Sequence, residues 1–118
     1  MISGNDFRIL ALALPHVLEK PHFQRSSFRV DVPKGKIFTT MPGDEASANL
    51  MLTRDQQDML CAAEPGIFSP LPNKWGEKGA TLIDFAACEL LTAKSVLKLA
   101  WKNAAPEKYW PQLDDVWT

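Results

Sequence analysis

The chain has 118 residues and a formal net charge of −1, with 46% hydrophobic and 23% charged residues. This length fits one domain over residues 1–118, and this composition excludes intrinsic disorder, fibrous repeats and a basic field over the whole molecule. The apolar run at 9–14 is too short to cross a bilayer, and no signal-peptide n-region precedes it, so we expect a cytoplasmic protein without a membrane span.

Charge is distributed unevenly along the chain. Residues 1–40 contain six Lys/Arg against three Asp/Glu, whereas residues 41–70 contain one against five. Residues 71–105 are basic again, with five against three, and residues 106–118 are acidic. Any basic surface must therefore come from the first and third of these segments.

The two cysteines, Cys61 and Cys88, have no CxxC spacing and no histidines at ligand intervals, so neither a disulfide framework nor a zinc site is indicated. Both lie in alanine-rich apolar segments, which favours packing in the core. The alternative concerns Cys88, which we expect close to a helix N-terminus, where a thiolate would be stabilised. No motif for a cofactor or another metal is present in the sequence.

The first half of the chain predicts one helix and three antiparallel strands. The helix has its apolar face at Phe7, Leu10, Ala11 and Leu14, and it ends at Pro15. From residue 21 the apolar period changes to two, so Arg25 and Arg29 should lie on a strand and point away from the core. A turn at 33–36 leads to two further strands at 36–41 and 47–53.

The second half predicts a short helix and then two strands. Thr53 and Gln56 form a capping box at the start of a helix that ends at residue 64. The residues of this helix expected to face inward are Met59, Leu60 and Ala63. The proline-rich segment 67–75 suits an edge strand, residues 76–79 suit its turn, and 80–87 alternate like a strand.

A last helix is predicted over residues 92–105. Lys94, Lys98 and Lys102 line one of its faces, for which a solvated surface is the favoured interpretation. The tail 106–118 contains Trp110 and Trp117, and we expect it to dock on the body of the protein.

These elements predict an α+β fold. Strands joined by tight turns must be antiparallel, so we expect two layers, with a single antiparallel sheet and helices on one face. The predicted order is α-β-β-β-α-β-β-α.

Five segments of the sequence, ALALPHVLEKPHF, SSFRV, GKIFTT, KWGEKGATLID and AWKNAAP, resemble the MmcQ/YjbR family of small bacterial proteins. The resemblance covers residues 7 to 106, and EKPHF and KWG..G are its most specific parts. It implies a fold like those of frataxin and type III secretion chaperones, and a DNA-binding role through wing-like hairpins has been suggested for the family. Ala80 departs from the family pattern, which usually has a large aromatic there, so a stacking role does not carry over to that position.

The segment NKWGEKGAT at 73–81 admits two interpretations. In the structural one, Gly76 and Gly79 provide positive φ angles in a tight hairpin while Trp75 is buried against the sheet. In the functional one, Lys74 and Lys78 at the tip contact phosphates and Trp75 offers a stacking plane. The structural interpretation, with a largely buried Trp75, is favoured.

His22 in the segment EKPHF is the histidine with a candidate binding role, because it precedes Arg25 and Arg29. A local hydrogen bond is the favoured alternative, and His16 is a weaker candidate. The iron binding of frataxin is rejected, since the first helix offers only Asp6 as a carboxylate ligand.

No catalytic motif is present, so we do not expect an enzyme. The leading hypothesis is a monomeric, non-catalytic module that binds an anionic ligand, with DNA as the candidate partner. Its candidate binding residues are His22, Arg25, Arg29, Lys74, Trp75 and Lys78. The alternative is a protein-interaction module similar to the secretion chaperones, which would use an apolar patch of Met51, Leu71, Leu82 and the tail tryptophans.

Overall fold

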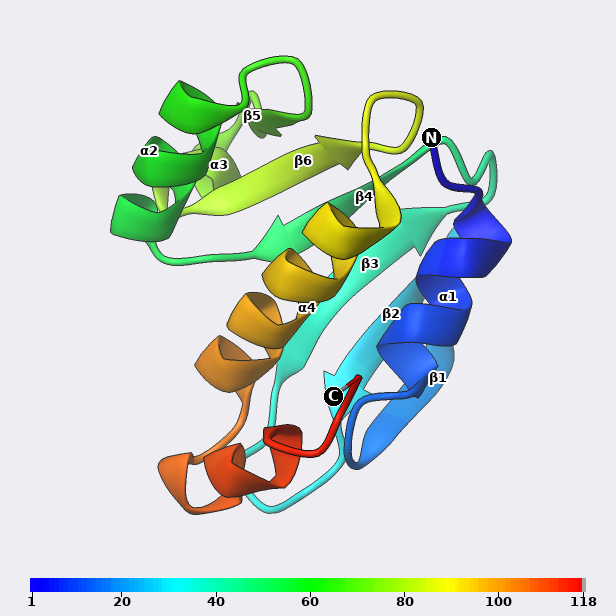
Figure 1. Cartoon of the computed structure of the whole chain (residues 1–118), viewed down its shortest axis with the longest axis vertical. Helices are drawn as coiled ribbons and strands as arrows, with labels where there is room; N and C mark the ends of the chain where they lie inside the picture. Colours follow the sequence, from blue (N-terminus) through cyan, green and yellow to red (C-terminus); the bar gives the residue numbers. More distant parts are fainter. Residues whose placement is uncertain (118) are drawn as a thin grey trace.

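The computed structural model describes residues 1–117, and Thr118, the last residue of the predicted tail, lies outside them. Within the described residues, six strands form one antiparallel sheet in the order β1-β2-β3-β4-β6-β5. The strands are β1 (Val17–His22), β2 (Arg25–Val30), β3 (Ile37–Pro42), β4 (Ser47–Met51), β5 (Phe68–Pro70) and β6 (Ala80–Asp84). The helices are α1 (Gly4–Leu12), α2 (Arg54–Ala63), α3 (Lys74–Glu77), α4 (Leu90–Ala104) and the 3-10 helix η1 (Glu107–Leu113) (Figure 1).

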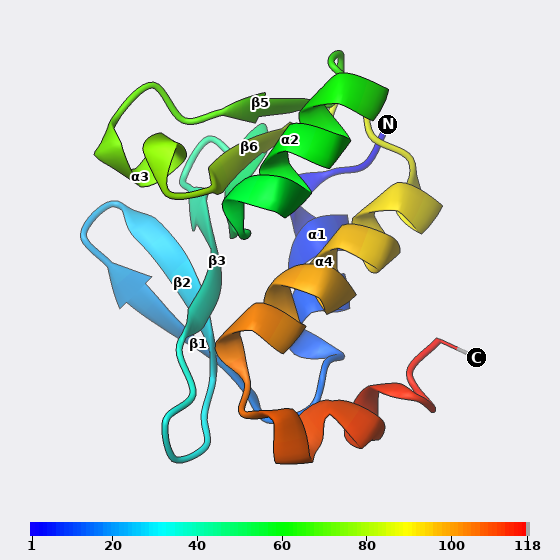
Figure 2. The same cartoon turned by 90° about the vertical axis from the view of Figure 1, so that its left-hand side faces the viewer.

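The two layers of the fold are the sheet and a group of helices on one of its faces. The helices α1, α2 and α4 lie on this face, whereas α3 lies on the opposite side, at one end of the sheet (Figure 2). The predicted α+β class with a single antiparallel sheet is confirmed. No helix within residues 1–117 has the length and apolar character needed to cross a membrane.

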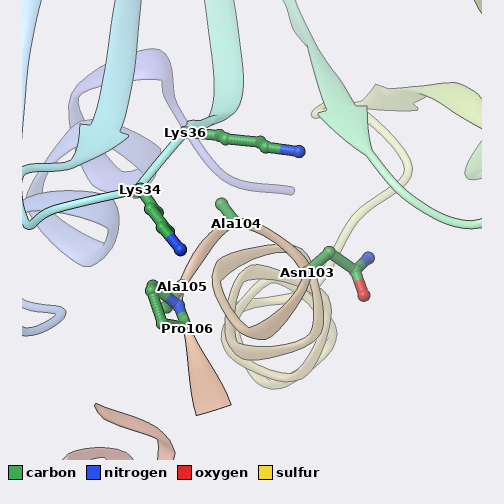
Figure 3. A pocket seen from close by; sticks show the side chains of 7 residues that line it. Lys34, Lys36, Asn103, Ala104, Ala105 and Pro106 are labelled. Carbon is green, nitrogen blue, oxygen red and sulfur yellow. The ribbon is translucent and has the colours of Figure 1, made fainter. Parts of the chain in front are cut away.

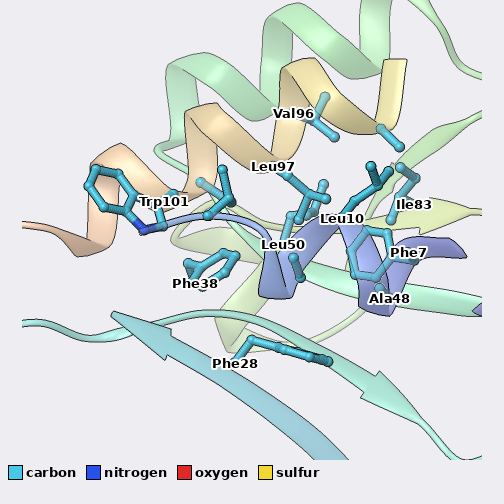
Figure 4. Close-up of a cluster of buried hydrophobic side chains, with 14 of the residues drawn as sticks. Phe7, Leu10, Phe28, Phe38, Ala48, Leu50, Ile83, Val96, Leu97 and Trp101 are labelled. Carbon is cyan, nitrogen blue, oxygen red and sulfur yellow. The ribbon is translucent and has the colours of Figure 1, made fainter. Parts of the chain in front are cut away.

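The core lies between the sheet and the helices α1 and α4 (Figure 4). Phe28 and Leu50 project from the strands toward Phe7 of α1 and Leu97 of α4, and all four are fully buried. Burial of each such side chain contributes about 1.5–3 kcal/mol to folding. The indole N–H of the buried Trp101 donates to the Pro15 carbonyl at 2.9 Å, which fixes the end of α4 against the α1–β1 connection.

The strand β1 is absent from the prediction, which began the sheet at residue 21. It pairs with the whole of β2, from Val17 opposite Val30 to His22 opposite Arg25. Pro21 lies inside β1, where it is tolerated because β1 is an edge strand. Four strands, instead of the predicted three, therefore lie between the helices α1 and α2 along the chain.

The prediction for the buried face of α2 is wrong. Met59 is 59% exposed and Ala63 is exposed, while Leu60 is only half-buried and Gln57 is 2% exposed. The reason is the position of α2, which contacts β5 and β6 at one end of the sheet instead of covering its centre. The predicted capping box of Thr53 is present.

The predicted hairpin turn at 76–79 is also wrong, because the chain forms the short helix α3 there. The Asn73 side chain caps this helix by accepting from the N–H groups of Trp75 and Gly76. Gly79 alone has the expected positive φ, at 121°. Gly76 is required for another reason: a Cβ at this buried position would overlap the Leu71 carbonyl group.

The tail docks on α4 as predicted, as far as residue 117. Trp110 donates its indole N–H to the carbonyls of Lys102 and Ala105, at 3.1 and 3.0 Å. The ammonium groups of Lys98 and Lys102 lie 5.6 and 5.5 Å from the ring centres of Trp117 and Trp110. The lysine face of α4 is therefore partly covered by aromatic rings: Lys94 and Lys98 are half-buried, whereas Lys102 is exposed, as the sequence suggested for all three.

Candidate functional site

The face of the sheet opposite α1 and α4, called the open face below, carries polar side chains at alternate positions. Paired residues of neighbouring strands share a face. His22 pairs with Arg25, and Thr40 pairs with both Ser27 and Asn49. Because Phe28 belongs to the core, Arg25 and Ser27 lie on the open face with their partners.

A groove of about 540 Å³ lies on the open face, with α3 as one wall. It is lined by His22, Arg25, Lys36, Ile37, Thr40, Asn49, Met51, Leu71, Asn73 and Trp75. Three of these residues are basic and none is acidic. The groove therefore combines positive charge, neutral hydrogen-bonding groups and an apolar floor.

Arg25 is the most constrained cation of the groove. Its Nε donates to Thr40 Oγ1 at 3.1 Å, and a terminal nitrogen donates to the Thr40 carbonyl at 3.2 Å. Desolvation by burial lowers the pKa of Arg25, and the more distant Asp44 carboxylate partly offsets this shift. Within residues 1–117 no carboxylate forms an ion pair with Arg25, so its guanidinium group is held in place by Thr40 without a salt bridge.

His22 and Phe23 form the tip of the β1–β2 hairpin, whose turn consists of Phe23 and Gln24. The two rings are in edge-to-face contact, with centroids 4.9 Å apart. His22 is exposed. Within residues 1–117 its ring packs against the neighbouring phenylalanine ring and does not form the local hydrogen bond that the sequence favoured.

Trp75 is 65% exposed, so the prediction of a buried tryptophan is wrong. The cause is α3: a helical turn directs Gly76 inward and Trp75 outward, whereas a hairpin would have placed Trp75 on the sheet. Two contacts hold this turn in position. Asn73 caps its N-terminus, and Gln57 Nε2 donates to the carbonyls of Gly76 and Ala80, both at 2.9 Å.

The remaining predicted site residues do not line the groove. Arg29 donates to the Gly35 carbonyl at 3.1 Å and is half-buried, which indicates a role in holding the β2–β3 connection. Lys74 and Lys78 are exposed on and after α3, and the Lys78 ammonium lies 5.9 Å from the centre of the Trp75 ring. The structure thus brings His22, Arg25 and Trp75 together and leaves the three other cations at the periphery.

Several of the groove residues were not identified from the sequence as binding residues, although two of them lie in recognisable sequence patterns. Asn73 precedes Lys74 as a helix N-cap would, and Lys36 follows the predicted turn at the start of a strand. Lys36 also borders a second hollow of about 600 Å³, between the β2–β3 connection and the end of α4. There Lys34 and Lys36 project toward Asn103 and Ala105 (Figure 3).

Cys88 packs in the core, the interpretation that the sequence favoured over a stabilised thiolate. It lies just before α4, but its side chain is fully buried and its Sγ donates to the Glu89 carbonyl at 3.3 Å. Burial is the main cause that raises the pKa of its thiol, and this outweighs the nearby N-terminal amine. Both cysteines are free.

The chain is similar in fold to Deinococcus radiodurans protein DR2400, which contains the family-model domain DUF419. The two share 18% sequence identity with a TM-score of 0.73, over 98% of this chain and 88% of the other. No curated protein matches the sequence significantly. The model of the YjbR family matches residues 12–110, which include both strands of the β1–β2 hairpin, α3 and the whole groove. The protein therefore belongs to the YjbR family.

Proposed function

We propose that the protein is a non-catalytic module that binds an anionic ligand, with DNA as the candidate, in the groove of the open face. The observation that supports this most is the convergence of His22, Arg25 and Lys36 in a groove that no carboxylate lines. The two cations of the groove, Arg25 and Lys36, lower the free energy of a bound anion because no acidic residue lines the groove beside them.

The surroundings of the groove extend its positive charge. By strand pairing Lys20 lies on the same face as His22, and Lys74 and Lys78 flank Trp75 on the opposite wall. A chain of phosphates crossing from the hairpin to α3 would meet these cations in turn. Most hydrogen bonds between proteins and DNA go to phosphates, for which such groups are suited.

A binding role is also more consistent with the groove than a catalytic one. His22 is the histidine of the groove, the residue type that most often serves as a general base, and no lining carboxylate orients it. We further propose that the protein works in the cytoplasm, where its two free cysteines would stay reduced.

Fluorescence anisotropy with labelled single-stranded and duplex DNA tests the proposal. Affinity should fall roughly 50-fold between 50 and 200 mM salt if about four phosphates of a single strand are contacted. Arg25→Gln should weaken binding about tenfold, since a hydrogen bond to a charged group is lost. Lys108→Gln is the matched control, because Lys108 is exposed on the tail, outside the groove. No binding at low salt, or equal losses in both variants, would contradict the proposal.

Protein interaction remains a second candidate. Met51 and Leu71 line the groove and Leu82 pairs with the groove residue Asn49, whereas the tail tryptophans lie apart from them, over α4. The observation in its favour lies on α1, where Ile9 and Leu12, one helical turn apart, are 58% and 42% exposed. Size-exclusion chromatography with light scattering should show a dimer that Ile9→Asp disrupts if α1 is a self-interface, and a monomer otherwise.

A further inference from the structure

We infer that the groove binds single-stranded nucleic acid, whose bases stack on Phe23 and Trp75 while its phosphates contact the cations. This inference rests on the proposed anion binding and adds the bases to it. It is carried by two exposed aromatic residues on elements far apart in the sequence: Trp75 lines the groove, and Phe23 lies beside it at the tip of the hairpin, in contact with the groove residue His22.

Phe23 is placed at a cost that the fold does not explain. Its side chain is 94% exposed, and its backbone has a φ of 59°, a conformation that glycine and asparagine adopt more readily. A phenylalanine in this turn therefore adds strain and exposes an apolar ring without contributing to the core. The two-residue turn accounts for the positive φ, so the unexplained feature is the exposed aromatic ring, which is available to a ligand.

Trp75 stands across the groove from the hairpin on a rigid support. The Asn73 cap and the Gln57 hydrogen bonds fix α3, and the close approach of Gly76 to Leu71 leaves the helix little freedom to shift. Figure 2 shows that α3 and the tip of the β1–β2 hairpin both project on the side of the sheet away from α1 and α4. A fixed, exposed indole ring is a suitable stacking plane for a base.

The groove suits an unpaired strand better than a duplex. Its volume is within the range of sites for small organic ligands, and Thr40, Asn49 and Asn73 offer hydrogen bonds to the edges of a base. A duplex keeps its bases stacked inside and would leave both rings without partners.

The experiment compares two oligomers of about ten units with equal charge, a thymidine oligonucleotide and an abasic deoxyribose-phosphate chain. Binding of labelled oligomers is followed by anisotropy. The thymidine oligomer should bind at least about tenfold more tightly, because each stacked base contributes about 1–3 kcal/mol. Phe23→Ala and Trp75→Ala should each weaken its binding about tenfold and leave the abasic chain unaffected. Phe23→Tyr should bind the thymidine oligomer as tightly as the unchanged protein, since it keeps an aromatic plane.

Two further variants distinguish anion binding from base stacking. Arg25→Gln should weaken binding of both oligomers, whereas Leu91→Ala, which changes an exposed apolar residue of α4 outside the groove, should weaken neither. Equal affinity for the two oligomers would overturn base stacking and leave anion binding intact. Binding of neither would overturn both proposals. Binding to anionic phospholipid vesicles, lost in the Phe23 and Trp75 variants, without binding to either oligomer would assign the aromatic residues to a membrane surface instead. Far-UV circular dichroism confirms that each variant is folded.

Discussion

Tryptophan and lysine side chains lie next to each other at two places in this protein, and the two places differ in how deeply the tryptophan is buried. In the tail, Trp110 and Trp117 are half-buried over the lysine face of α4. At α3, Trp75 is mostly exposed beside Lys78. The residue types and the ring-to-ammonium distances are similar, so the difference comes from what surrounds each pair.

Hydrogen bonds account for most of this difference. The indole N–H of Trp110 reaches two carbonyls, and Lys98 donates to the Val116 carbonyl at 2.7 Å. No such hydrogen bond is made by the side chains of Trp75 and Lys78 within residues 1–117. The tail pair therefore stabilises the fold, whereas the α3 pair is available to a ligand.

The largest effect expected from this comparison belongs to Trp110. Trp110→Ala should lower the free energy of unfolding by about 3 kcal/mol, because it removes a large side chain packed on the core together with the donor to Lys102 and Ala105. Urea denaturation measures this. Trp110→Phe, which keeps an aromatic ring, should cost about half as much. A loss below about 1 kcal/mol would mean that the tail contributes little.

The second-largest effect on stability is expected at Gly79, which follows α3. Gly79→Ala should cost about 2 kcal/mol, because the residue has a positive φ and its new Cβ would overlap the Leu52 carbonyl. Gly66→Ala is the matched control: a Cβ there meets nothing within 4 Å, and its effect should stay within about 0.5 kcal/mol. Thermal melts of the two variants distinguish them, and equal melting temperatures would contradict the geometry described for α3.

A smaller effect is expected for Lys98. Lys98→Met keeps the length of the side chain but loses the hydrogen bond to Val116 and the charge over Trp117, which should cost about 1 kcal/mol. Lys78→Met makes the same change beside Trp75, where no such hydrogen bond exists, and should be close to neutral. Chemical denaturation of the pair compares the two sites directly; a neutral Lys98→Met would remove the distinction between them.

The smallest effect on stability is expected for Trp75. Trp75→Ala should change the free energy of unfolding by no more than about 0.5 kcal/mol, since the side chain is mostly exposed and its backbone is capped independently by Asn73. Differential scanning calorimetry is the measurement. A loss of about 3 kcal/mol, the amount typical of a core tryptophan, would show that the ring is buried after all.

The parts of the fold that were predicted correctly depend on local periodicity. Alternation at period two places Arg25 on the face opposite Phe28, whichever strands flank β2. Thr53 and Gln56 mark the start of α2 for the same reason, since a capping box involves neighbours in the sequence only.

The errors concern residues whose state depends on distant segments. Gln57 is buried because Gly76 of α3 and Ala80 of β6 present carbonyl groups to its side chain, and no pattern within α2 predicts these two acceptors. Trp75 was misplaced because two glycines suggested a hairpin, although Asn73 carried the signal of a helix cap. The groove itself unites β1 with α3, which lie more than 50 residues apart and meet through the order of the sheet.

Because the tail docks on α4, truncation of the protein would change both its net charge and its exposed surface. Residues 107–118 contain one lysine and three acidic residues, so their removal changes the formal net charge from −1 to +1. It would also remove the tryptophan rings that lie beside the ammonium groups of Lys94, Lys98 and Lys102. A truncated protein would thus present a more exposed cationic helix than the intact one, and its binding to nucleic acid would reflect the truncation instead of the open face.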